Sequence, residues 1–186
     1  MIGSSERTLA HTRQITCEAY RRGDGDWEIE ASVRDLKAEV VPFRSRPPVV
    51  PGQPMHDMRL VFLIDAAGTI RDVKAAMQAA PWPSCREATR AYEKLIGVTI
   101  GPGLRARVRE RVGGVLGCTH LTDLITQVGN AYMQAAWPAR VAAQIAIDPD
   151  PRRWPDQQAL SFVGACHAWT LDGEAVRTEY PELLSR

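Results

Sequence analysis

The chain has 186 residues, of which 45% are hydrophobic and 24% charged, and its formal net charge is +1 at pH 7. This length favours one domain that spans residues 1–186, and this composition excludes an intrinsically disordered chain. A net charge near zero gives no long-range field that would attract nucleic acid or an acidic membrane, so we expect neither as a partner.

No segment has the composition of a transmembrane helix or a secretory signal. The longest apolar runs, such as residues 60–64, are far shorter than the ~18–20 residues that a membrane-spanning helix needs. The N-terminus lacks the basic stretch and following apolar stretch of a signal peptide. Four widely spaced cysteines without a CxxC pair favour free thiols. We therefore expect a cytoplasmic protein.

Alternating apolar and polar residues predict strands in the N-terminal half. A Gly/Asp turn joins the first two into a hairpin, and a proline-rich loop precedes the third, whose apolar centre indicates a central position. The fourth segment has equal helix propensity, and we expect a strand there. The predicted strands cover residues 13–20, 27–35, 55–65 and 69–76.

The C-terminal half shows helical periodicity instead. Ser84 is expected to cap a helix that ends near residue 96, and a short second helix is predicted over 104–112. A third, strongly amphipathic helix begins at Thr119 and should stop at Pro138. We therefore predict an α+β fold, with a curved antiparallel sheet from the N-terminal half packed against helices from the C-terminal half.

The second predicted helix carries four alternating arginines. Such a run is compatible with a nucleic-acid surface or with a solvated helix face. No aromatic residues are interleaved with the arginines, so the solvated face is the better explanation. The four residues are Arg105, Arg107, Arg109 and Arg111.

The first candidate site is the pair His56-Asp57, at the start of the predicted central strand. Neighbouring residues of a strand point to opposite faces, so one of these two side chains faces inward. Histidine is the side chain whose ordinary pKa best suits proton transfer near neutral pH. The alternative is that His56 only caps the strand and bonds a loop carbonyl.

The second candidate site is a glycine-rich turn, residues 113–117, followed by Cys118, Thr119 and His120. Free N–H groups at the start of the next helix favour an anion and lower the pKa values of a nearby thiol or imidazole. The alternative is an ordinary tight turn in which Cys118 is buried as a small hydrophobic residue.

The third candidate is Cys166-His167 beside Trp169, where a structural role is the better interpretation. The four histidines and four cysteines come singly from distant segments rather than in spaced pairs, so the sequence does not require a metal. No GxGxxG, Walker loop, HExxH or GxSxG motif is present.

Three ordered segments resemble the bacterial domain-of-unknown-function family 2889: AYRRGDGDWEIE at 19–30, MHDM at 55–58 and GCTHL at 117–121. The resemblance extends from Arg13 to the helix that ends near Ala136, and CHAW at 166–169 is also similar to family tails. The family is associated with proteobacteria that consume plant-derived aromatics. The resemblance therefore implies an enzyme that acts on a small phenolic compound.

Without a nucleotide, flavin or pyridoxal signature, we expect side chains to supply the chemistry and no cofactor to be bound. The hypothesis is a lyase that cleaves a carbon–carbon bond of a plant- or lignin-derived phenolic compound and releases a small aldehyde such as formaldehyde. One histidine, His56 or His120, would act as general base. Two alternatives are a hydrolase or dioxygenase with His, Asp or Cys ligands to a divalent metal, and a non-catalytic ligand-binding protein.

The expected partner is thus a small aromatic substrate, and a homodimer is compatible with the sequence. The predicted site combines residues from both halves of the chain. The expected catalytic residues are His56, His120, Asp57 and Tyr20, and the expected substrate-binding residues are Arg13, Trp27, Tyr92, Cys118, Thr119, Leu121 and His167.

Overall fold

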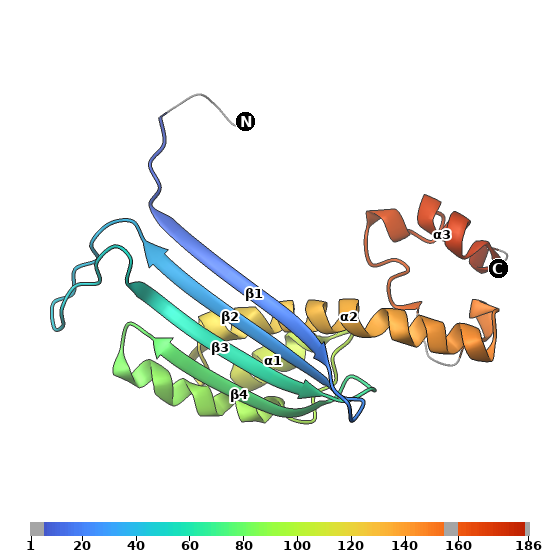
Figure 1. The fold of residues 1–186 in the computed structure, drawn as a ribbon, viewed down its shortest axis with the longest axis horizontal. Helices are drawn as coiled ribbons and strands as arrows, with labels where there is room; N and C mark the ends of the chain where they lie inside the picture. The colour runs from blue at the N-terminus through green and yellow to red at the C-terminus, as the bar shows by residue number, and fades with distance from the viewer. Residues whose placement is uncertain (1–5, 155–159, 185–186) are drawn as a thin grey trace. The chain divides into compact units, whose positions relative to one another are not determined.

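The computed structural model of the protein describes residues 6–154 and 160–184 (Figure 1). The chain divides into two compact units, Met1–Tyr132 and Met133–Arg186. The expectation of a single domain over residues 1–186 stays a prediction.

The first unit contains a four-stranded antiparallel sheet in the order β1-β2-β3-β4. Each predicted strand is present, including the segment whose helix propensity was equal, and β3 occupies a central position. This confirms the α+β class and the antiparallel sheet. The strands are β1 (His11–Arg21), β2 (Trp27–Lys37), β3 (Pro54–Ile64) and β4 (Ile70–Ala79).

Helices lie on one face of this sheet, here called the inner face (Figure 1). The inner face carries the alternate apolar residues of β2 and β3, as the period-two pattern predicted. Helix α2 (Thr119–Ile147) places its apolar stripe against them. The largest residues of the core are at most 1% exposed: Ile29, Val33, Met58, Leu60, Phe62, Ile64, Ile70, Tyr92, Leu95, Leu121, Leu124 and Tyr132.

Between β4 and α2 the chain forms η1 (Pro83–Leu95), α1 (Leu104–Val112) and η2 (Gly114–Leu116). The predicted helix capped by Ser84 is wrong in its type and its start, because η1 is a 3-10 helix preceded by Trp82 without a side-chain cap. Its path is fixed by tertiary contacts instead, since the Arg86 guanidinium donates to the carbonyls of Met77 (3.2 Å) and Gln78 (3.3 Å) in β4.

Helix α2 does not stop at Pro138, as was predicted, but continues to Ile147. Proline removes only one backbone donor, and the residues around it are rich in alanine, which has the highest helix propensity. No helix within the described residues is long and apolar enough to cross a membrane.

The second unit is built from short helices around an aromatic cluster. Beside Cys166 the chain forms a 3-10 turn, η5 (His167–Trp169). The ring centroid of Phe162 lies 4.5 Å from that of Trp169, 5.0 Å from that of Trp137 and 5.5 Å from that of Tyr180. The other elements are η3 (Pro151–Arg153), α3 (Glu174–Glu179) and η6 (Pro181–Leu184).

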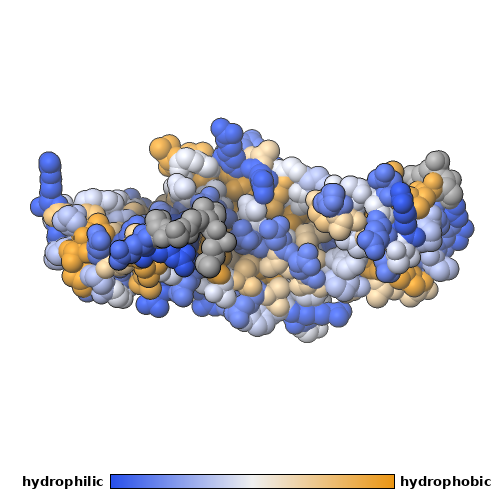
Figure 2. Space-filling view, turned by 90° about the horizontal axis from the view of Figure 1, so that it is seen from above, coloured by the Kyte–Doolittle hydropathy of each residue, from blue (hydrophilic) through white to orange (hydrophobic). Residues whose placement is uncertain are grey.

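The surface combines hydrophobic and hydrophilic residues. Figure 2 shows hydrophobic residues scattered among hydrophilic ones on the face in view. Single exposed apolar side chains are normal on a protein surface, so most of them need no special explanation. Those in the first unit include Ile15 of β1 and Val115 of η2.

Candidate functional site

Three polar residues form one cross-strand row on the inner face of the sheet. Arg13 of β1 pairs with Asp35 of β2, and Asp35 pairs with His56 of β3. The three inner-face positions of β2 directly before Asp35 are apolar and buried, Ile29, Ala31 and Val33, so the row stands where the apolar core ends. The strand register alone therefore brings a cation, a carboxylate and an imidazole together.

Asp35 is the centre of this group. It is 2% exposed, and no other charged residue is buried among the residues that the structure describes. Arg13 donates from Nε to Oδ1 (2.8 Å) and from Nη2 to Oδ2 (2.7 Å), and His56 Nδ1 lies 2.9 Å from Oδ2. His11 Nε2 lies 3.3 Å from Oδ1. Hydrogen bonding to Arg13 lowers the pKa of Asp35 to about 2, so the carboxylate is charged at neutral pH.

The second histidine, His120, comes from the first turn of α2 and stacks on His56. The ring centroids lie 3.8 Å apart with an interplanar angle of 33°. This confirms the prediction that the two histidines lie close together. Burial, followed by the charge of His56, lowers the pKa of His120 below its ordinary value. This shift favours the neutral form of His120.

A buried hydroxyl fixes the start of α2 and with it the backbone of His120. Tyr92 Oη accepts from the Cys118 N–H (3.0 Å) and lies 2.8 Å from the Cys118 carbonyl and 2.9 Å from Thr122 Oγ1. A Cβ on Gly117 would lie 2.5 Å from the Val112 carbonyl oxygen, so the turn before the helix requires glycine there. Cys118 Sγ lies 3.8 Å from Nδ1 of His120.

The comparisons with known proteins bear on this region of the chain. The sequence model of the family described as "Protein of unknown function (DUF2889)" matches residues 11–134. The chain belongs to this family. No curated protein matches the chain, and no solved structure matches it either. The DUF2889 match begins at His11 and includes the whole group around Asp35.

Two predicted catalytic residues lie outside the histidine group, which consists of Arg13, Asp35, His56 and His120. Asp57 points to the outer face of the sheet, opposite His56, and its Oδ2 lies 3.7 Å from Arg34 Nε. Tyr20 is also on the outer face, 47% exposed, and its hydroxyl donates to Glu18 (3.1 Å). Strand alternation explains both placements, because each residue directly follows a residue whose side chain points to the inner face.

Of the predicted substrate-binding residues, Arg13 belongs to the group, Cys118 contacts it, and exposed Thr119 precedes His120. Tyr92 and Leu121 are 0% exposed and belong to the core, so neither presents a surface to a ligand. Trp27 is at the other end of β2 from Asp35, and its ring meets that of Tyr132 edge-on at 6.5 Å. His167 belongs to the second unit, outside the DUF2889 match.

Asp35 and His11 are the site residues that the sequence reasoning missed. The signal for Asp35 was present, since it continues the inner-face parity of Ile29, Ala31 and Val33 in a strand whose apolar residues are buried. A carboxylate at a buried parity position requires partners, and Arg13 and His56 are those partners.

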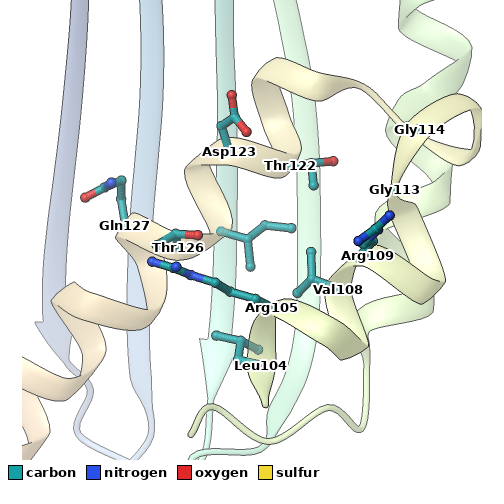
Figure 3. A pocket seen from close by; sticks show the side chains of 11 residues that line it. Leu104, Arg105, Val108, Arg109, Gly113, Gly114, Thr122, Asp123, Thr126 and Gln127 are labelled. Atoms are coloured by element: carbon teal, nitrogen blue, oxygen red, sulfur yellow. The ribbon is translucent and has the colours of Figure 1, made fainter. Parts of the chain in front are cut away.

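A surface hollow of about 510 Å³ lies between α1 and α2 (Figure 3). Its floor is apolar, from Leu104, Val108 and Ile125, and the side chain of Arg105 reaches across it toward Thr126. Neither His56 nor His120 lines this hollow. The hollow is therefore separate from the histidine group, and we do not assign the substrate to it.

The stacked pair predicts a specific titration. In NMR titrations, His120 should gain its proton with a midpoint below the ordinary histidine value of about 6.5. In His56→Ala the midpoint should rise, because the neighbouring charge is removed and the ring is less buried. A His120 midpoint at or above the ordinary value, or one that His56→Ala leaves unchanged, would contradict this electrostatic account.

Proposed function

We propose that the protein is a cofactor-independent enzyme whose Asp35, His56 and His120 group transfers a proton during cleavage of a small substrate. The observation that carries this proposal is the 2.9 Å contact between His56 Nδ1 and buried Asp35, with His120 stacked at 3.8 Å. A base that is oriented by a buried carboxylate is a recurrent arrangement for proton abstraction.

His56 is the better candidate for the general base. Its Nδ1–H donates to Asp35, which leaves the lone pair on Nε2 for a substrate hydroxyl. The carboxylate also stabilises the imidazolium that forms. Burial opposes protonation of His120, so its role is to hydrogen-bond the substrate while His56 takes the proton.

The proposed reaction is cleavage of a carbon–carbon bond in a phenolic compound. His56 removes the proton of a side-chain hydroxyl, and the C–O bond of that group becomes the C=O of a released aldehyde. The C–C bond breaks, and its electron pair passes to the carbon that is conjugated with the ring. That carbon then takes a proton back from His56, so atoms and charge balance. The phenolic class rests on the family resemblance, and the proton transfer rests on the geometry.

A screen of lignin-derived phenolic alcohols tests this function. The wild-type protein should release a small aldehyde and a phenolic product in equal amounts from at least one compound, and the double variant His56→Ala, His120→Ala should release neither. Aldehyde release that the double variant retains would contradict the proposal.

A divalent metal at the same residues is the second candidate. One ligand atom each from Asp35, His56 and His120 lies within 4.8 Å of the others, and two histidines with one carboxylate are a common metal-binding set. Both Asp35 oxygens, however, already accept from the Arg13 guanidinium, and a cation would have to displace or adjoin that charge.

Removal of metal separates the two candidates. We expect chelator-treated, dialysed protein to keep its full activity, because the proton transfer needs no ion. Activity that disappears with chelator and returns with one divalent ion would contradict the cofactor-free mechanism and support the metal site. The His167→Ala variant is the control in the same assay and should respond to chelator as the wild type does, since His167 is not one of the three grouped residues.

A further inference from the structure

The two edges of the sheet differ in how their backbone groups are bonded. At β4, the N–H of Ile70 donates to Val98, its carbonyl accepts from Gly97, and Arg86 donates to two carbonyls near the strand's end. At β1, the edge that points away from β2 pairs with no other strand of the described residues (Figure 1). We call this side of β1 the open edge.

The hydrogen-bond pattern identifies the groups that the open edge presents. Ala38 N–H donates to the Ala10 carbonyl, and Arg22 N–H donates to the Asp26 carbonyl. Even-numbered residues of β1 therefore bond to β2, and the alternation of an antiparallel ladder directs the N–H and C=O groups of odd-numbered residues to the open edge. These are His11, Arg13, Ile15, Cys17, Ala19 and Arg21.

The open edge lacks several devices that prevent strand pairing. All 11 residues of β1 pair with β2 without a register shift, and the strand contains no proline. Ile15 lies on the inner face and is nevertheless 46% exposed, whereas its cross-strand neighbour Val33 is 1% exposed. The apolar inner face thus continues to the edge without cover.

We propose that the open edge pairs with the β1 strand of a second copy of this chain, in antiparallel register centred on Thr16. In this register all 11 residues of β1 pair, both copies of Arg13 face Ala19, and Arg21 faces His11 rather than another arginine. Ile15 then lies beside Cys17 of the second copy, Gln14 faces its Glu18, and Thr16 faces its Thr16.

Neighbouring registers are less favourable. A shift of two residues in one direction places Arg13 opposite Arg21 of the second copy, and like charges directly opposite destabilise a sheet. The same shift in the other direction leaves Tyr20 and Arg21 without strand partners in the second copy. The centred register therefore combines the most backbone hydrogen bonds with complementary side chains and joins the two sheets into one continuous sheet.

Engineered cysteines test both the partner and the register. In a Cys17→Ala background, Thr16→Cys should form a disulfide-linked dimer on mild oxidation, because facing residues of a non-hydrogen-bonded pair have Cα atoms about 4.5 Å apart. Gln14→Cys is the matched control on the same face, since its two copies would lie about 13 Å apart along the strands. For Thr16→Cys, mass spectrometry should locate the bond between position 16 of one copy and position 16 of the other.

Sedimentation of the wild-type chain should show a concentration-dependent dimer. Ala19→Pro removes an N–H that points to the open edge but none that bonds to β2, so it should raise the dissociation constant about tenfold or more while circular dichroism stays unchanged. A chain that is monomeric at every concentration overturns the proposal. So does Gln14→Cys that cross-links as fast as Thr16→Cys. Neither readout depends on an enzymatic activity.

Discussion

Replacing Asp35 with alanine is expected to lower the free energy of unfolding by about 3 kcal/mol. The side chain is 2% exposed and accepts from Arg13 and His56, so its loss leaves their charged and polar groups without an acceptor. Urea unfolding followed by circular dichroism measures the change. Asp57→Ala is the matched control, because Asp57 faces outward and its contact with Arg34 is long, so its cost should be below about 0.5 kcal/mol. Equal costs for the two variants would contradict a structural role for the buried carboxylate.

The pH dependence of stability provides a second readout for Asp35. Its folded pKa of about 2 lies below the unfolded value. The unfolded carboxyl therefore binds its proton first as pH falls, and this contribution to stability is complete above pH ~4 and is lost between pH ~4 and ~2. A shift of this size corresponds to about 2 kcal/mol. In Asp35→Asn the stability should change less across this range than in the wild type. Identical pH profiles for the two proteins would refute the lowered pKa.

Replacing His56 with alanine is expected to reduce kcat by about 10²- to 10⁴-fold, which is the usual contribution of a positioned general base. His56→Gln should be reduced to a similar degree, because the amide can bond Asp35 but cannot accept a proton at neutral pH. Initial rates on the phenolic substrate measure both variants. His167→Ala is the control for loss of a histidine, since it lies outside the family match and should keep the wild-type rate. A His56→Gln rate within a few-fold of wild type would remove His56 from the proton transfer.

The sequence predicted the sheet well because its strands obey a period-two pattern that burial enforces. Strand β3 and the apolar residues of β2 are examples, since a shift by one residue would expose the whole core. The pattern could not predict that the helix starting at Thr119 passes Pro138, because an alanine-rich context can tolerate one missing donor. It also could not predict η1, whose path depends on Arg86 reaching β4, a contact made only in the folded chain.

The sequence predicted the two histidines of the site but not their neighbours. His56 and His120 were identifiable from their positions at element ends, and their stacking follows once the start of α2 meets the start of β3. Asp57 and Tyr20 were wrong as neighbours of the pair, because the side chain of each points to the outer face of the sheet, opposite the two histidines. Asp35 became visible only through the register, which places it between Arg13 and His56.

Chemical rescue of His56→Ala by free imidazole tests the central claim most directly, because it asks whether the missing group is a base rather than a structural element. The variant leaves a space between Asp35 and His120 in which an added imidazole can bond the carboxylate as His56 does. We predict that aldehyde release by His56→Ala rises with imidazole concentration, more steeply at pH values where imidazole is neutral, and that Asp35→Ala shows no such increase. A folded His56→Ala protein whose rate is unaffected by imidazole at every pH would contradict the assignment of His56 as the general base.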